Sequence, residues 1–137
     1  MAQGWVFECS ECQYALEAWS DGNPYYYDTG GKLVVQIIHP DPDTLEVQRQ
    51  RKIYVYHPSH PKWPIVGNDV RHICLDCGRK FYVDIVGLEE VDDRHVPPPC
   101  IRCDGPNVVA LWDLQGRTCP KCRRGQFGCD PDSIMIS

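Results

Sequence analysis

Four Cys-x-x-Cys pairs constrain this chain more than any other feature. The 137 residues include nine cysteines, and eight of them form the pairs Cys9/Cys12, Cys74/Cys77, Cys100/Cys103 and Cys119/Cys122. Each pair closes a tight loop that aims two thiols at one point, and two such loops supply the four sulfurs of a tetrahedral zinc site. The sequence therefore predicts two Cys₄ sites holding two Zn²⁺ ions. Four thiolates fill the coordination shell, so we expect the zinc to be structural rather than catalytic.

The four pairs can share two ions in three ways. A nested arrangement joins Cys74/Cys77 to Cys100/Cys103 and the outer pair Cys9/Cys12 to Cys119/Cys122. A sequential arrangement joins the first pair to the second and the third to the fourth, and a crossed arrangement is typical of cross-braced zinc domains. The nested arrangement is favoured because C-L-D-C-G-x-x-F reads as an opening loop and P-C-I-R-C-D-G as a closing one.

The stretch between Cys74 and Cys103 carries a resemblance to a known family. It reads C-L-D-C-G-R-K-F-Y-V, then a polar turn, then V-P-P-P-C-I-R-C-D-G, with Gly78 at a position that usually needs positive φ. These motifs resemble the zinc-ribbon family, with its rubredoxin-like Cys₄ knuckles on β-hairpins. The resemblance implies one zinc gripped by two hairpins. The whole chain is also similar to small bacterial zinc-ribbon proteins of unassigned function, which implies no mechanism.

The rest of the chain predicts an all-β, metal-stabilised fold with an antiparallel sheet inserted between the zinc ligands. Alternating or continuous apolar runs indicate strands, and no amphipathic helix of useful length is present. Expected strands cover residues 5–7, 14–16, 32–39, 44–50, 51–57, 81–85, 108–114 and 134–136, and residues 20–24 form a turn signal.

The nested arrangement also predicts how the chain is organised. We expect residues 1–137 to form a single compact unit. Within it, residues 1–19 and 107–137 form an outer zinc clasp, residues 25–70 an inserted β-sheet, and residues 71–106 a central zinc ribbon.

Charge and composition limit the partners and the compartment. The formal net charge is −5; eight thiolates would add −8 and two Zn²⁺ ions +4, which brings it to −9. Such a protein repels phosphate overall. No apolar run approaches the ~20 residues of a membrane span, and no secretory signal or lipid anchor is recognisable. Structural zinc in a reducing cytoplasm is the consistent expectation, rather than disulfides.

We expect a structural zinc-binding adaptor or scaffold with a protein partner, and no catalytic or cofactor-binding residues beyond the metal ligands. One alternative is a nucleic-acid-binding module that uses the basic side chains around the fourth cysteine pair. These are Arg117, Lys121, Arg123 and Arg124. The other interpretation of these four side chains is that they offset the thiolate charge.

A further alternative is a metalloenzyme. For that role, His57, His60 and the ninth cysteine, Cys129, have no recognisable partners in the sequence.

Overall fold

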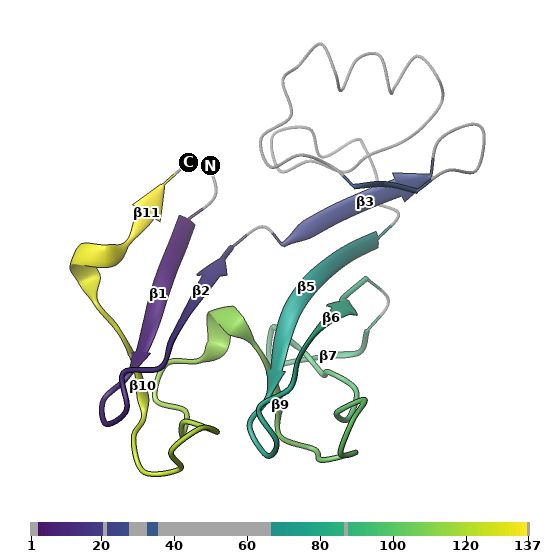
Figure 1. Ribbon diagram of the computed structural model, residues 1–137. Helices are drawn as coiled ribbons and strands as arrows, with labels where there is room; N and C mark the ends of the chain where they lie inside the picture. Colours follow the sequence, from purple (N-terminus) through teal and green to yellow (C-terminus); the bar gives the residue numbers. More distant parts are fainter. Residues whose placement is uncertain (1–2, 21, 28–32, 36–66, 87, 137) are drawn as a thin grey trace.

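A computed structural model describes residues 3–20, 22–27, 33–35, 67–86 and 88–136 of the chain (Figure 1). This part is nearly all β, as predicted, with β-strands and two short 3₁₀ turns. The strands expected at residues 44–50 and 51–57 lie outside the described residues, as do His57 and His60. Within the described ranges, no helix is long and apolar enough to cross a membrane.

The first sheet brings the two ends of the chain together. Its central strand, β1 (Gln3–Cys9), pairs along one edge with β2 (Ala15–Trp19), and along the other with β10 (Phe127–Cys129) and β11 (Met135–Ile136). All pairs are antiparallel, and Phe7 lies opposite both Leu16 and Cys129. The strand expected near residues 134–136 is therefore confirmed over its last two residues, where it borders the first residues of β1 (Figure 1).

The second sheet is built around β5 (Gly67–Cys74). This strand pairs with β6 (Lys80–Asp84) on one side, and with β3 (Asn23–Tyr27) and β9 (Val108–Ala110) on the other. β4 (Leu33–Val35) extends the sheet beyond β3 and is the described part of the apolar strand expected at residues 32–39. A separate hairpin joins β7 (Glu90–Val91) to β8 (Arg94–His95).

Two local predictions differ from the structure. The strand expected over residues 108–114 ends at Ala110 and is followed by the 3₁₀ turn η1 (Leu111–Asp113). Leu111 and Leu114 are both buried, and residues three apart share a face in a 3₁₀ turn but lie on opposite faces of a strand. The turn expected over residues 20–24 is shorter, since β3 already begins at Asn23.

One hydrophobic core connects the two sheets through η1. Phe7, Leu16 and Ala18 of the first sheet meet Ile73 of the second, and Leu111, Leu114 and Phe127 complete this cluster. The Tyr14 ring meets Phe127 edge to face, with ring centroids 6.1 Å apart. Cys9 and Cys119 belong to the same cluster, and a second cluster contains Cys74 and Cys100. The first cysteine of each pair is thus a core residue.

We predict that Ile73→Ala lowers the free energy of unfolding by about 2 to 5 kcal/mol, because it leaves a cavity where the two sheets meet. Ile73 is 0% exposed. Urea denaturation of the metal-loaded protein measures the change. Ile101→Ala is the matched control: this isoleucine is 70% exposed, and the same truncation there should change stability by less than about 0.5 kcal/mol. Equal effects of the two substitutions would contradict this packing.

Candidate metal centres

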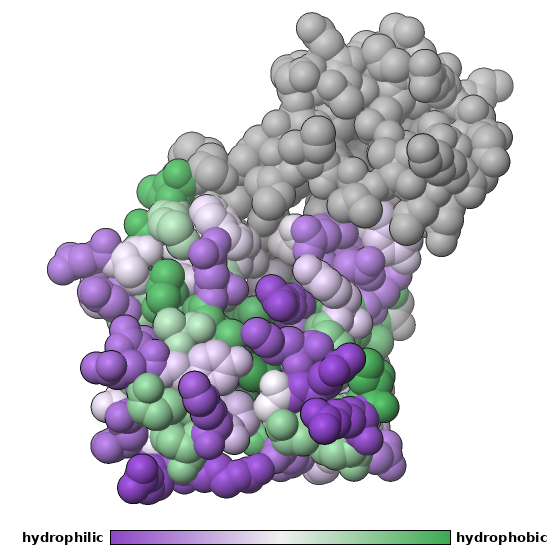
Figure 2. All heavy atoms as spheres, in the orientation of Figure 1, coloured by the Kyte–Doolittle hydropathy of each residue, from purple (hydrophilic) through white to green (hydrophobic). Residues whose placement is uncertain are grey.

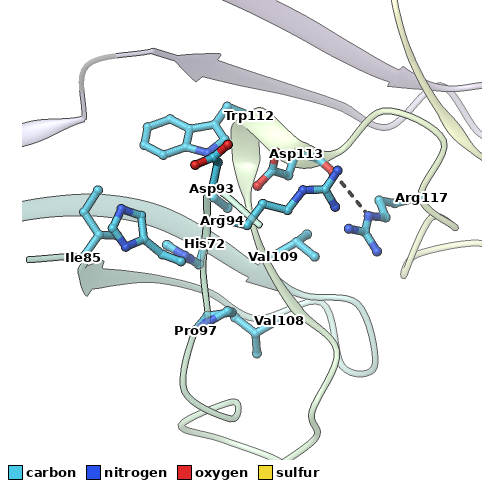
Figure 3. Close-up of a pocket in the computed structure, with 12 residues that line it drawn as sticks. His72, Ile85, Asp93, Arg94, Pro97, Val108, Val109, Trp112, Asp113 and Arg117 are labelled. Carbon is cyan, nitrogen blue, oxygen red and sulfur yellow. Dashed lines mark hydrogen bonds between the residues drawn. The ribbon is translucent and has the colours of Figure 1, made fainter. Parts of the chain in front are cut away.

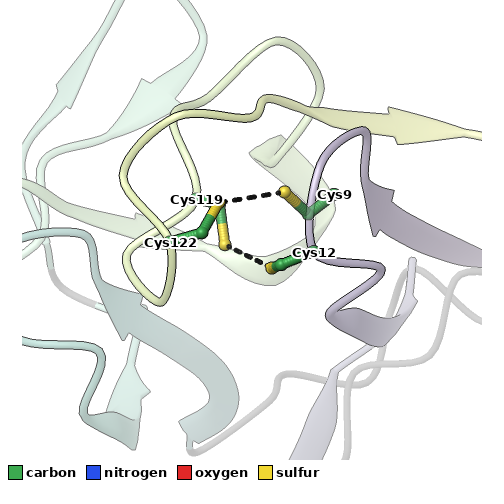
Figure 4. A group of neighbouring side chains, drawn as sticks. All are labelled: Cys9, Cys12, Cys119 and Cys122. Carbon is green, nitrogen blue, oxygen red and sulfur yellow. Dashed lines mark hydrogen bonds between the residues drawn. The ribbon is translucent and has the colours of Figure 1, made fainter.

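The structure gathers the eight paired cysteines into two groups of four. Cys9 and Cys12 meet Cys119 and Cys122 in an outer centre, and Cys74 and Cys77 meet Cys100 and Cys103 in an inner centre. In each group all four sulfurs lie within 4.8 Å of one another. This is the nested arrangement, and the sequential and crossed arrangements are not formed. Figure 4 shows the outer group, whose four side chains point toward a common centre.

The sulfur separations fit a tetrahedral metal site. Sγ–Sγ distances are 3.6 Å for Cys9 and Cys122 and 3.7 Å for Cys12 and Cys119 in the outer centre. In the inner centre they are 3.6 Å for Cys74 and Cys103 and 3.6 Å for Cys77 and Cys100. Zinc–sulfur bonds of about 2.3 Å in a tetrahedron place neighbouring sulfurs about 3.8 Å apart. A disulfide needs about 2.05 Å, and all the cysteines are free. Both groups could therefore hold a metal ion, consistent with sites of the zinc-ribbon kind.

All four loops share one backbone conformation. In each, the residue after the second cysteine has positive φ and donates its N–H to the carbonyl of the first cysteine. These residues are Gln13 (φ 63°), Gly78 (81°), Asp104 (59°) and Arg123 (60°), with N···O distances of 3.2, 2.8, 2.9 and 2.9 Å. Only a glycine adopts this conformation without strain. Gln13, although not a glycine, therefore has the same local structure as Gly78.

Backbone N–H groups point at several of the sulfurs. Glu11 donates to Cys9 Sγ, Arg102 to Cys100 Sγ, Gly105 to Cys103 Sγ and Gly125 to Cys122 Sγ, each at 3.4 Å. Hydrogen bonds of this kind favour the thiolate. Backbone N–H groups, that of Cys103 foremost, lower the pKa of Cys100 to about 6. The N–H groups of Arg124 and Gly125 likewise lower the pKa of Cys122 to about 6.

Other thiols of the same groups resist ionisation. The backbone N–H of Gly105 lowers the pKa of Cys103, but burial and the three neighbouring sulfurs outweigh it and raise that pKa to about 12. Cys12 behaves in the same way. A hydrogen bond with the Tyr14 backbone lowers the pKa of Cys12, but burial and the neighbouring sulfurs outweigh it and raise that pKa to about 11. Burial is the main cause of the raised pKa of Cys74. Four thiolates cannot share such a space unless a cation offsets their charge, so this donor set fits a thiophilic divalent ion.

The two centres are in contact. The Arg123 guanidinium, from the last loop of the outer centre, donates to the backbone carbonyl of Asp76 in the first loop of the inner centre. The Asp76 carboxylate in turn accepts from Asn107 Nδ2 at 2.8 Å. The cysteine loops therefore lie together at one end of the molecule (Figure 1).

The remaining candidate residues lie outside both centres. Cys129 is half-buried, belongs to neither group, and directs its sulfur at its own neighbour's carbonyl, Asp130 O, at 3.7 Å. Among the basic residues, Arg117 Nε donates to Asp113 O at 3.3 Å, and Lys121 Nζ lies 5.5 Å from the centre of the Tyr14 ring.

A separate cavity of about 360 Å³, lined by His72, His95 and Trp112 among others, has no counterpart in the sequence prediction. Its residues come from distant segments, so no local motif indicates it. The one available signal is the spacing of His72 between Val70 and Cys74, which puts all three on one face of β5. His72 is 2% exposed, its Nδ1 bonds to Val70 O at 2.9 Å, and burial lowers its pKa.

Comparison with known proteins finds no match to this chain among the family models, the curated proteins or the solved structures.

We predict that Gly125→Ala weakens metal binding at the outer centre. A Cβ at Gly125 would lie 2.4 Å from Cys9 Sγ and 2.9 Å from the backbone nitrogen of Glu11, so the ligand loop must shift. Metal analysis should find a deficit at the outer centre alone, because Gly125 touches no inner ligand. Gly128→Ala is the control, since nothing lies within 4 Å of a Cβ there and the metal content should not change. Full metal content in Gly125→Ala would contradict the geometry.

Proposed function

We propose that this protein is a structural zinc-binding adaptor, in which two Cys₄ sites hold Zn²⁺ and the stabilised surface binds another protein. The observation that carries the proposal is the closed set of four sulfurs at each centre. Catalytic zinc keeps an open position for water, whereas four thiolates leave none. Zinc suits such a site because it is redox-inactive and prefers tetrahedral sulfur ligands. The free thiols also suit a reducing compartment, and we propose the cytoplasm.

The size of the core supports a structural role for the metal. Cys9, Cys74 and Cys119 are at most 2% exposed and pack among the core side chains. A structural zinc site contributes an apparent ~10 to 16 kcal/mol in small peptides near neutral pH, while a whole domain has a net stability of only ~5 to 15 kcal/mol. The free energy of metal binding at two such sites would therefore be at least as large as the net stability of a domain of this size.

The pairing of the sheets supports a single unit. β9 lies in the segment assigned to the outer clasp, yet it pairs with β5, which leads directly into the inner centre. The shared core and the contact between Arg123 and Asp76 cross the same boundary. We therefore keep the proposal that residues 1–137 form one unit, whose parts are joined by these strands.

The contacts of the basic side chains favour a protein partner over a nucleic acid. Arg123, Arg117 and Lys121 each have an intramolecular contact, to Asp76 O, Asp113 O and the Tyr14 ring respectively. Arg123 and Lys121, held in this way beside the outer thiols, offset thiolate charge, and the formal net charge of −5 opposes binding to the extended phosphate backbone of a nucleic acid. A nucleic-acid interface around the fourth cysteine pair would depend chiefly on Arg124.

Exposed apolar side chains supply candidate contacts for a protein. Val91 in β7 and Val96 just after β8 are 52% and 47% exposed, and Ile101 on the third cysteine loop is 70% exposed. The hydrophobic residues at the upper left of Figure 2 lie over β11, where Ile136 is 69% exposed. Much of the lower part of this face is hydrophilic, with apolar residues in between (Figure 2). Such a mixed surface is typical of non-obligate protein interfaces.

We predict that Cys119→Ser removes one of the two metal ions and destabilises the fold, because it takes a sulfur that is 0% exposed from the outer centre. Elemental analysis of the purified protein measures zinc and iron, and near-UV circular dichroism follows the packing of the aromatic residues. Cys129→Ser is the control and should keep both ions, since Cys129 belongs to neither group. A wild-type protein without metal would refute the proposal, and iron in place of zinc would refute the metal assignment.

We predict that the metal-loaded protein is not retained on single- or double-stranded DNA or on RNA at physiological salt. Retention that falls steeply with added salt, and is lost in Arg124→Glu, would instead support the nucleic-acid interface. Arg79→Glu, at an exposed arginine elsewhere on the surface, controls for the change in net charge. A protein partner recovered with the wild type should stay bound as salt increases.

A further inference from the structure

The cavity beside η1 is distinct from the metal centres. Its volume is about 360 Å³, within the range of ~300 to 1,000 Å³ usual for small-molecule sites. β5, the β7–β8 hairpin, β9 and η1 supply its walls, and none of the eight paired cysteines lines it. Figure 3 shows His72 on one side of this space, Arg94 and Arg117 on the other, and Val109 between them.

Two histidines that line the cavity each have a ring nitrogen without a partner among the described residues. His72 is 2% exposed, and its Nδ1 must carry the proton because it faces the carbonyl oxygen of Val70 at 2.9 Å. Nε2 of the same ring has no hydrogen bond to a described residue, and in the neutral ring it is an acceptor. The Nδ1 atom of His95 is buried and likewise lacks a partner among the described residues. Of these two atoms, His95 Nδ1 is the buried one, and buried polar atoms without a partner are rare.

The opposite side of the cavity carries charged groups of both signs. Arg94 and Arg117 line it and make no ion pair within the described part of the chain, although Arg117 Nε donates to Asp113 O. Asp93 and Asp113 line it as well, so the formal charge of the four side chains cancels. The indole of Trp112 adds a flat apolar surface beside Asp93 (Figure 3). A matching ligand needs an anionic group for the arginines, N–H donors for the carboxylates and the His72 imidazole, and a planar ring.

We propose that this cavity binds a nucleoside monophosphate. The phosphate would meet Arg94 and Arg117, whose planar guanidinium groups suit its oxygens. The base would lie against Trp112 and donate a ring or amino N–H group toward His72 Nε2. A free phosphate would satisfy only the arginines and a nucleoside only the inner wall, so the nucleotide is the ligand that accounts for both. The proposal does not depend on the zinc assignment, because no metal ligand contributes to the cavity.

Isothermal titration calorimetry of the metal-loaded protein tests this, with GMP, AMP, guanosine, inorganic phosphate and a single-stranded oligonucleotide as separate ligands. We expect at least one nucleotide to bind more tightly than guanosine or phosphate. Arg94→Ala should raise its Kd about 10-fold or more, because a charge-assisted hydrogen bond is lost. Arg79→Ala is the matched control, since Arg79 is also exposed but does not line the cavity. Arg94 is exposed too, so its truncation should leave folding and metal content unchanged.

Each other outcome contradicts the proposal in its own way. Binding of neither nucleotide would mean that the cavity does not take this ligand. Equal affinities for phosphate and nucleotide would reduce it to an anion site without base recognition. Unchanged affinity in Arg94→Ala would place the nucleotide elsewhere on the protein, and tighter binding of a single-stranded oligonucleotide would make nucleic acid the ligand. Metal analysis of the same samples separates these results from a failure of the zinc sites.

Discussion

The convergence of four sulfurs at each centre is the constraint on which the rest of the structure depends. The outer centre joins cysteines 113 positions apart, Cys9 and Cys122, and so fixes the two ends of the chain against each other. The entropic cost of closing a loop grows only slowly with the length of the loop. A metal ion that closes a long loop therefore has to offset only a slightly larger entropic cost than one that closes a short loop. β1 can then pair with β10 and β11, strands from the far end of the chain.

The same constraint explains why the ligand loops tolerate backbone strain. Gln13, Asp104 and Arg123 hold positive φ at positions where glycine would be relaxed. This conformation costs of the order of 1 kcal/mol or more for each residue, which the ~10 to 16 kcal/mol of a structural zinc site would outweigh if zinc binds as proposed. At one of these positions the side chain also makes a contact that glycine could not make. The Arg123 guanidinium donates a hydrogen bond to the backbone carbonyl of Asp76, in a loop of the other centre. The strained position therefore supplies a contact between the two centres.

The sequence predicts what short-range patterns encode and misses what tertiary packing decides. The cysteine spacing indicates the eight residues that gather into two groups, the apolar runs indicate the all-β class, and the loop context around Cys74 and Cys100 favours the nested pairing that the structure contains. The turn at Leu111 is missed because an apolar run looks the same whether it continues as a strand or bends to bury two leucines. The cavity is missed because His72, His95 and Trp112 meet only after the strands pair. Local patterns cannot indicate such contacts.

The cavity and the metal centres are connected through the chain rather than through shared residues. From Arg94 on β8 the backbone passes through Cys100 and Cys103 of the inner centre, then forms β9 and η1, and reaches Arg117 two residues before Cys119 of the outer centre. The two arginines that face the cavity are thus held by segments that the two centres anchor separately. The two walls that carry these arginines therefore adjoin different cysteine groups, although no paired cysteine lines the cavity itself.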